Sequence, residues 1–102
     1  MKKNNLIKCS TTELKILGDF WTLEIIQELN NGEKRFSQLQ RGLPTISPTT
    51  LANRLKKLKK QNLISSKKET LDKLSVVYLL TSKGQGIVPI LKEIKHFAEK
   101  YL

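Results

Sequence analysis

The clearest alternation of apolar and polar positions in the chain lies between residues 47 and 62. Leu51, Leu55 and Leu58 are four and three residues apart, so they share one side of a helix. At about 100° per residue, the other side carries short polar side chains first and lysines after them: Thr49, Thr50, Asn53, Lys56, Lys57 and Lys60. Ser47 is a favourable N-cap and Pro48 a favourable first helical residue. The pattern predicts an amphipathic helix over about 48–61.

Three shorter helices are predicted before it. The first covers about residues 13–17, and the second starts after Asp19, a favourable N-cap, with an apolar residue at every fourth position: Trp21, Ile25 and Leu29. An extended piece at 34–36 then leads to a third helix. We take Ser37 as its N-cap and Gly42 as its approximate end.

Two strands and a last helix are predicted after it. Residues 63–68 and 75–80 are typical of strands, and the segment between them contains no Gly, Pro or Asn that would favour a tight turn. We therefore expect a longer hairpin tip there. Thr81 can cap a final helix that reaches about residue 101, and Pro89 either kinks this helix or marks its true start.

This order of elements predicts a mostly helical α+β fold, a winged helix-turn-helix with a small sheet of two or three strands. A chain of 102 residues is long enough for one domain. We expect a flexible N-terminus at 1–8 and a folded domain at 9–102. Within that domain the wing would cover about 63–80 and the C-terminal helix about 82–101, and the N- and C-terminal helices would serve dimerisation.

The positive charge is concentrated around the amphipathic helix. The chain has 19 Lys and Arg against 9 Asp and Glu, a net charge of +10. Residues 48–73 alone hold eight basic and two acidic side chains, which is +6 in about a quarter of the length. Such a segment is typical of proteins that bind phosphates through counterion release. Taken alone, the helix fits a groove reader and a solvated surface equally well, and the charge favours the groove reader.

Other classes of function are disfavoured by the composition. No apolar run approaches the ~20 residues that cross a bilayer, and no signal peptide is evident, so we expect a cytoplasmic protein that does not bind membranes. The single Cys9 excludes an intramolecular disulfide, and His96 has no partner at metal-ligand spacing. Nucleophile motifs and glycine-rich phosphate loops are absent. We therefore predict no catalytic residue, no metal and no cofactor.

Several short motifs follow one another along the chain after Cys9. They are Leu17-Gly18-Asp19-Phe20-Trp21, Arg35-Phe36-Ser37-Gln38-Leu39, Ile46-Ser47, Leu51-Ala52-Asn53-Arg54-Leu55-Lys56-Lys57-Leu58 with Leu63-Ile64, and Leu80-Thr81-Ser82-Lys83-Gly84. Together they resemble the HxlR family, a set of prokaryotic winged-helix transcription regulators related to the MarR group. The resemblance covers nearly the whole chain from about residue 9.

The resemblance implies a homodimer, built from the first and last helices, on a pseudo-palindromic operator in double-stranded DNA. Each subunit would place residues 48–60 in a major groove and its hairpin tip near the adjacent backbone or minor groove. The dimer interface implied in this way comprises Leu14, Leu17, Leu91, Ile94, Phe97, Ala98 and Tyr101. The chain departs from the family at residues 72–78, where a proline-rich run is usual, and at Ser10, where a proline is usual.

Thr49, Thr50 and Asn53 are the candidates for contact with base edges. Asparagine can pair with adenine through two hydrogen bonds, and a threonine methyl can touch that of thymine. Arg54, about 60° from Leu51, can reach guanine or a phosphate, or it can cover the helix flank. The remaining candidates would hold the DNA backbone: Arg35, Ser37, Ser47, Lys56, Lys57, Lys60, Lys67, Lys68 and Lys73. The alternative for the whole set is ordinary polar surface.

Cys9 is a possible redox sensor, since the resemblance implies an oxidant-sensitive cysteine near the N-terminus in some members. The alternative is an inert cysteine packed against the dimer partner. The function predicted for the chain is a sequence-specific transcription regulator, with repression favoured over activation. Two alternatives stay open, a non-specific architectural DNA-binding protein and a winged-helix module for protein contacts. The sequence identifies no small-molecule effector.

Overall fold

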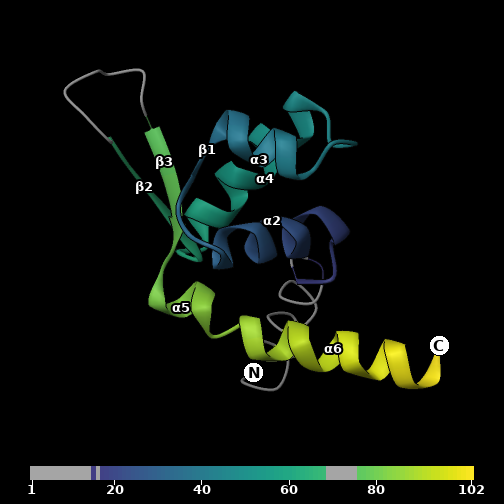
Figure 1. The fold of residues 1–102 in the computed structure, drawn as a ribbon. Helices are drawn as coiled ribbons and strands as arrows, with labels where there is room; N and C mark the ends of the chain where they lie inside the picture. The colour runs from purple at the N-terminus through teal and green to yellow at the C-terminus, as the bar shows by residue number, and fades with distance from the viewer. Residues whose placement is uncertain (1–14, 16, 69–75) are drawn as a thin grey trace, which may run out of the picture.

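The computed structural model describes residue 15 and residues 17–68 and 76–102. In chain order the elements are α2 (Phe20–Asn30), β1 (Lys34–Arg35), α3 (Phe36–Gly42), α4 (Pro48–Lys60), β2 (Ile64–Lys68), β3 (Val76–Leu80), α5 (Ser82–Gln85) and α6 (Val88–Tyr101) (Figure 1). Lys15 and Leu17 are also helical, in the predicted first helix. The predictions for the N-terminus, Cys9, Leu14, the hairpin tip and Lys73 lie outside the described residues.

The predicted caps of the two central helices are confirmed. Asp19 precedes α2 in an extended conformation, and its carboxylate accepts a hydrogen bond from the backbone N–H of Thr22. Ser47 precedes α4 and its Oγ accepts from the N–H of Thr50, while Pro48 is the first helical residue. Each cap satisfies a backbone donor that the first helical turn leaves without a partner. Both helices therefore start where local chemistry dictates.

The predicted cap of α3 is wrong. The helix begins at Phe36, its N-cap is Arg35, and Ser37 lies inside the first turn. The physical reason is Gln38, whose Oε1 accepts the backbone N–H of Arg35 at 2.8 Å. That bond closes the helix start two residues earlier than a Ser37 cap would.

The single C-terminal helix predicted over 82–101 is two helices. Thr81 caps α5, which has only four residues, and α6 starts at Val88 with Pro89 in its first turn. Proline has no backbone N–H to donate to Gln85, so a continuous helix would lose that bond. Of the two roles left open for Pro89, the structure shows the second: it marks the true start of the last helix.

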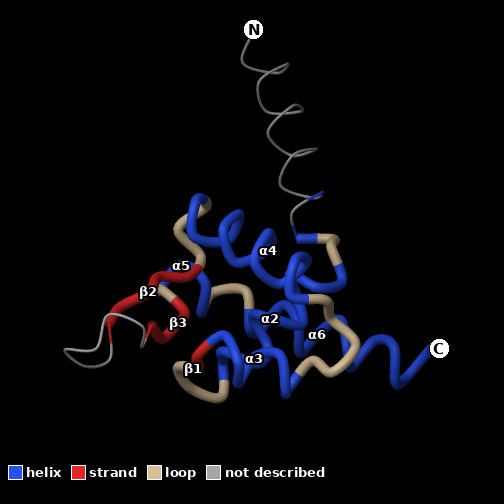
Figure 2. The backbone as a smooth tube through the Cα atoms, turned by 90° about the horizontal axis from the view of Figure 1, so that it is seen from above, coloured by secondary structure: helices blue, strands red, loops and turns tan. Residues whose placement is uncertain are grey.

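The sheet has three antiparallel strands in the order β1-β3-β2. Lys34 of the short outer strand β1 pairs with Tyr78 of β3, and Ile64 of β2 pairs with Leu80 of β3 at the base of the hairpin. The strands lie together at one side of the helices (Figure 2). This arrangement of helices and hairpin is the predicted winged helix-turn-helix.

The core lies between α2, α3, α4 and the sheet. Its most deeply buried side chains come from all four elements and are Ile25, Ile26, Leu39, Leu51, Leu58 and Val77. α6 packs on α2 through its first turns and then runs past the body of the molecule to the C-terminus (Figure 1). Among the described residues, no helix is long and apolar enough to span a bilayer.

Candidate nucleic-acid interface

α4 turns its apolar side inward and its polar side to solvent, as its spacing predicts. Leu51, Leu55 and Leu58 are at most 2% exposed, whereas Thr49 and Asn53 are exposed. Burial of three leucines stabilises the helix against the core by several kcal/mol in total, at about 2 kcal/mol for each. The core thereby determines which side of α4 is buried and which side faces solvent.

The start of α4 is ordered by a second contact besides the cap. The Ser47 hydroxyl donates to Thr50 Oγ1 at 2.9 Å and also accepts the N–H of Thr50. Thr50 is half-buried. Thr49 and Asn53 are thus the more accessible members of the predicted base-reading set.

The end of α4 is closed by a Schellman motif. The N–H of Leu63 donates to the carbonyl of Leu58, and the N–H of Asn62 donates to that of Lys59. Asn62 has φ of +63°, the left-handed conformation that this motif requires and that asparagine tolerates better than most residues. The buried Leu58 and Leu63 are the apolar pair that accompanies the motif.

α5 is joined directly to this end of α4. Thr81 Oγ1 donates to the carbonyl of Asn62 at 2.6 Å, and Lys83 Nζ donates to that of Gln61 at 2.9 Å. A β-carbon on Gly84 would lie only 2.1 Å from the carbonyl oxygen of Leu63, so only glycine fits here. The Leu80–Gly84 motif therefore locks the short helix α5 onto the end of α4.

Arg54 points towards the start of α2. Its Nε donates to Asp19 Oδ2 at 2.7 Å and its Nη2 donates to Oδ1 at 3.2 Å. The two side chains are 26% and 29% exposed. The guanidinium holds the pKa of Asp19 below its usual value mainly through this hydrogen bond, and Asp19 in turn raises the pKa of Arg54. Of the roles foreseen for Arg54, this geometry favours covering the helix flank.

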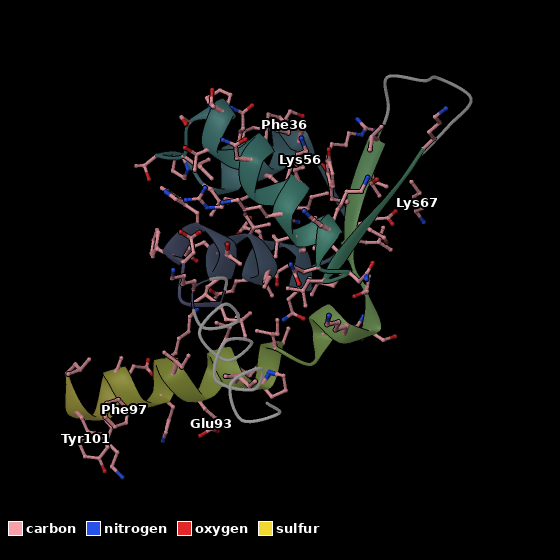
Figure 3. The ribbon with its side chains drawn as sticks, turned by 180° about the vertical axis from the view of Figure 1, so that it is seen from behind. Phe36, Lys56, Lys67, Glu93, Phe97 and Tyr101 are labelled. Carbon is pink, nitrogen blue, oxygen red and sulfur yellow. The ribbon has the colours of Figure 1, made fainter. Side chains whose placement is uncertain are left out.

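The basic side chains of α4 and the wing lie on adjoining elements. Lys56, Lys57 and Lys60 are exposed on α4, and Lys67 and Lys68 are exposed on β2; Figure 3 labels Lys56 and Lys67. Lys59 Nζ donates to Ser66 Oγ at 2.8 Å and so ties α4 to the hairpin. Lys67 also pairs with Glu33 at 3.2 Å, an exposed ion pair that contributes little stability. Ser37 and Arg35 are exposed at the start of α3.

A second surface is apolar and lies on α6. Ile90, Ile94, Phe97 and Tyr101 are all more than half exposed, although they are large hydrophobic residues. Phe97 and Tyr101 contact each other with ring centroids 5.0 Å apart, and both lie near the free end of the helix (Figure 3). Ala98 is half-buried there. Leu91, which is predicted at a dimer interface, lies in the core of its own chain, and Leu17 packs partly against that core.

The sequence alone did not reveal Asp19 as a partner of Arg54, Lys83 and Thr81 as anchors of α4, or Ile90 as part of the exposed stripe. Only Ile90 had a signal in the spacing of apolar residues, four positions before Ile94. In the described part of the chain, no three His, Cys, Asp or Glu residues lie close enough to hold a metal ion.

Comparison with known proteins adds the family. Residues 16–102 match the model of the HxlR-like helix-turn-helix. The chain belongs to this family. As an HxlR-like protein it is a DNA-binding, helix-turn-helix transcription regulator. The resemblance seen in its motifs is thus confirmed.

Similar proteins agree with this assignment. The HTH-type regulator YvaP of Bacillus subtilis is 33% identical over 87 residues, which cover 85% of this chain and 81% of YvaP. The regulator YodB of the same organism is 29% identical over 98 residues, which cover 96% and 88%. Its reduced form has a TM-score of 0.80 to this structure, with 89% of each chain covered. A MarR-family protein of Porphyromonas gingivalis W83 also scores 0.80, at 33% identity and 91% coverage of both chains.

Proposed function

We propose that this HxlR-like regulator is a homodimer that binds a pseudo-palindromic operator in double-stranded DNA and represses transcription. The observation that carries the proposal is the presentation of α4. Its three leucines are locked in the core, and its start offers Thr49 and Asn53 to solvent. A helix held in this way can enter a major groove with its N-terminal polar residues against base edges.

The basic side chains would supply most of the affinity. Lys56, Lys57 and Lys60 follow the base-reading positions on α4, and Lys67 and Lys68 extend the positive surface along β2. Lysines act on phosphates as point charges, so they orient the protein without reading sequence. In this division of roles, the base edges are read by Thr49, Thr50 and Asn53, and the phosphates are bound by the lysines.

The apolar stripe of α6 supports the homodimer. Four large hydrophobic side chains along one helix, each more than half exposed, form the kind of surface that marks a protein interface. A second copy of the chain is the natural partner, because two identical helices can pair about a twofold axis. Two subunits related in this way would face a pseudo-palindromic site.

Repression is the simpler outcome of such binding. Occupying a promoter is enough to exclude polymerase, whereas activation also needs a productive contact with it. A regulator of this kind acts where the chromosome is, so the proposal places the protein in the cytoplasm, at the nucleoid.

The proposal is tested by titrating the protein with DNA from its own upstream region and with a scrambled control, across a range of salt. We expect a clear preference for the upstream DNA together with a steep salt dependence. A steep dependence without preference would support a non-specific architectural protein. No binding to either DNA would support a module for protein contacts, and then Asn53→Ala and Lys57→Ala would have no effect on activity.

Cys9 is the candidate for regulation by oxidants. Structures of YodB are known in reduced, diamide-treated and quinone-bound forms, which motivates the same question for this chain. The test compares DNA binding of the wild type and Cys9→Ser before and after diamide. A response that Cys9→Ser abolishes would support a thiol switch. Equal binding throughout would support a cysteine that only packs at the interface.

A further inference from the structure

The carboxylate of Asp19 joins two helices that are far apart in the sequence. It caps α2, where Oδ2 accepts the N–H of Thr22 at 2.9 Å and the hydroxyl of Thr22 at 3.0 Å. The same carboxylate accepts two hydrogen bonds from Arg54 on α4, at 2.7 and 3.2 Å. All four contacts fix its orientation, and Thr22 is itself buried, at 4% exposed. Asp19 is therefore a rigid anchor for the guanidinium.

Arg54 connects this anchor to the polar side of α4. It directly follows the exposed Asn53 and lies one turn after the half-buried Thr50. Both of these residues are candidates for base contact. The leucine stripe fixes which side of α4 is buried, but the hydrophobic effect that drives this burial has no directional preference of its own. A planar guanidinium bound at two points is directional. The ion pair therefore restricts motion that the core leaves open.

The contact with Asp19 also occupies part of the Arg54 guanidinium. Both the Nε and one Nη face Asp19, and the side chain is only 26% exposed. An arginine that reads guanine needs its two-pronged edge free for the base. Here part of that fork is already occupied.

We propose that Asp19 and Arg54 are positioning residues for sequence recognition: their ion pair sets the angle at which α4 presents Thr49 and Asn53, and Arg54 itself does not contact DNA. This inference rests on the proposed sequence-specific binding. It assigns Asp19 a role in recognition although Asp19 lies outside the DNA-facing side of α4.

The experiment measures binding of upstream and scrambled DNA by the wild type, Asp19→Asn, Arg54→Gln and the double variant, across salt. Asparagine is as good an N-cap as aspartate, so Asp19→Asn removes the charge and keeps the cap. Glu99→Gln is the matched control, because it makes the same charge change at an exposed position on α6. Circular dichroism of every variant at the binding temperature establishes that it is folded.

In each single variant we expect the ratio of upstream to scrambled affinity to fall about three- to tenfold. The ratio of the double variant should be no lower than the lower of the two single-variant ratios, because both changes remove the same contact. The salt slope of Asp19→Asn should match that of Glu99→Gln, and the slope of Arg54→Gln should stay close to that of the wild type. Asp19→Asn raises the net charge, which strengthens binding to every DNA sequence alike, so the charge change alone should leave the ratio unchanged, as the Glu99→Gln control checks. A role in stability alone would lower the melting temperature and leave the ratio unchanged in the folded variants.

Arg54→Lys provides the deciding variant, and it also serves if Arg54→Gln does not fold. Lysine keeps the charge but cannot form the two-point contact. Positioning predicts that Arg54→Lys loses preference like Arg54→Gln, whereas a phosphate contact predicts that it binds like the wild type. An unchanged ratio in Asp19→Asn, or a salt slope reduced by about one in Arg54→Gln, would overturn the inference. A wild type without preference would instead defeat the proposed function, and this inference with it.

Discussion

α4 and α6 have similar lengths, 13 and 14 residues, and each has a proline in its first turn, yet they expose different chemistry. α4 buries all of its leucines and exposes threonine, asparagine and lysine. α6 buries Leu91 and leaves Ile94, Phe97 and Tyr101 in solvent, where the helix extends past the rest of the chain (Figure 1). A helix that satisfies its apolar side within the subunit can offer a polar surface to a charged ligand. A helix that does not has an apolar surface left for protein.

The largest effect should come from charges on the exposed stripe of α6. Ile94→Asp combined with Phe97→Asp should weaken self-association by at least about a thousandfold. Each of the two side chains would contribute roughly 1.5–3 kcal/mol when the dimer buries it, and the new carboxylates would be desolvated there. Sedimentation velocity over a range of concentrations measures this. The control is Lys92→Asp with Glu99→Asp, which lies outside the stripe and makes the same change in net charge. A dimer that survives the stripe variant would show that α6 is not the interface.

The next largest effect is expected inside α4. Leu55→Ala should lower the free energy of unfolding by about 2–5 kcal/mol, because Leu55 is 2% exposed and its loss leaves a cavity. Urea unfolding monitored by circular dichroism checks this. Ile94→Ala is the matched case on α6. The loss of unfolding free energy caused by Ile94→Ala should depend on protein concentration, whereas the loss caused by Leu55→Ala should persist at the lowest concentrations. If both losses depend on concentration in the same way, the contrast between the two helices is removed.

Truncation of the exposed Asn53 should affect DNA binding without affecting folding. Asn53→Ala should weaken binding to the preferred DNA by about 1–3 kcal/mol and relax the preference at one base pair, because the paired hydrogen bonds are lost. Fluorescence anisotropy against operator variants measures this effect. Equal weakening on scrambled DNA would show that Asn53 does not read a base.

A smaller and uniform effect is expected at Lys57. Lys57→Ala should weaken binding to every DNA alike and reduce the salt slope by about one, because one phosphate contact is lost. The same titrations at several salt concentrations provide the measurement, with Lys100→Ala on α6 as the charge-matched control. A loss confined to one sequence would place Lys57 among the reading residues.

The smallest effect concerns the ion pair that anchors α4. The folded pKa of Asp19 lies below the value of 3.8 for an unpaired aspartate, chiefly because Arg54 donates to it. The charged form is thus favoured by folding, so the stabilisation is complete above about pH 5 and is lost as the pH falls through the folded pKa. Asp19→Asn should cost up to about 1 kcal/mol at pH 6, as solvent partly screens the pair, and less at about pH 2, where the carboxylate becomes protonated. Urea unfolding at both pH values tests this, and a constant difference would exclude the ion pair as its source.

Much of the fold could be predicted because its signals are local. Ser47, Pro48 and the three leucines of α4 act within one helix, and Asp19 caps α2 through a residue three positions away. The start of α3 was missed because two local signals competed and Gln38, rather than Ser37, closed the first turn. The pairing of Asp19 with Arg54 spans 35 residues, and no spacing rule reaches that far. For the same reason the accessible candidates for DNA contact were predictable, but their supporting contacts were not.

The joint between α4 and α5 has a consequence for the distance between the two halves of an operator. The end of α4 accepts hydrogen bonds from Thr81 and Lys83, and Gly84 packs directly against the backbone that follows it. Only Gly86 and Ile87 separate α5 from α6. In a dimer formed through α6, the separation of the two α4 helices would therefore be a property of the rigid subunit rather than of a linker. Such a protein should tolerate changes of base sequence better than the insertion or removal of a single base pair between half-sites.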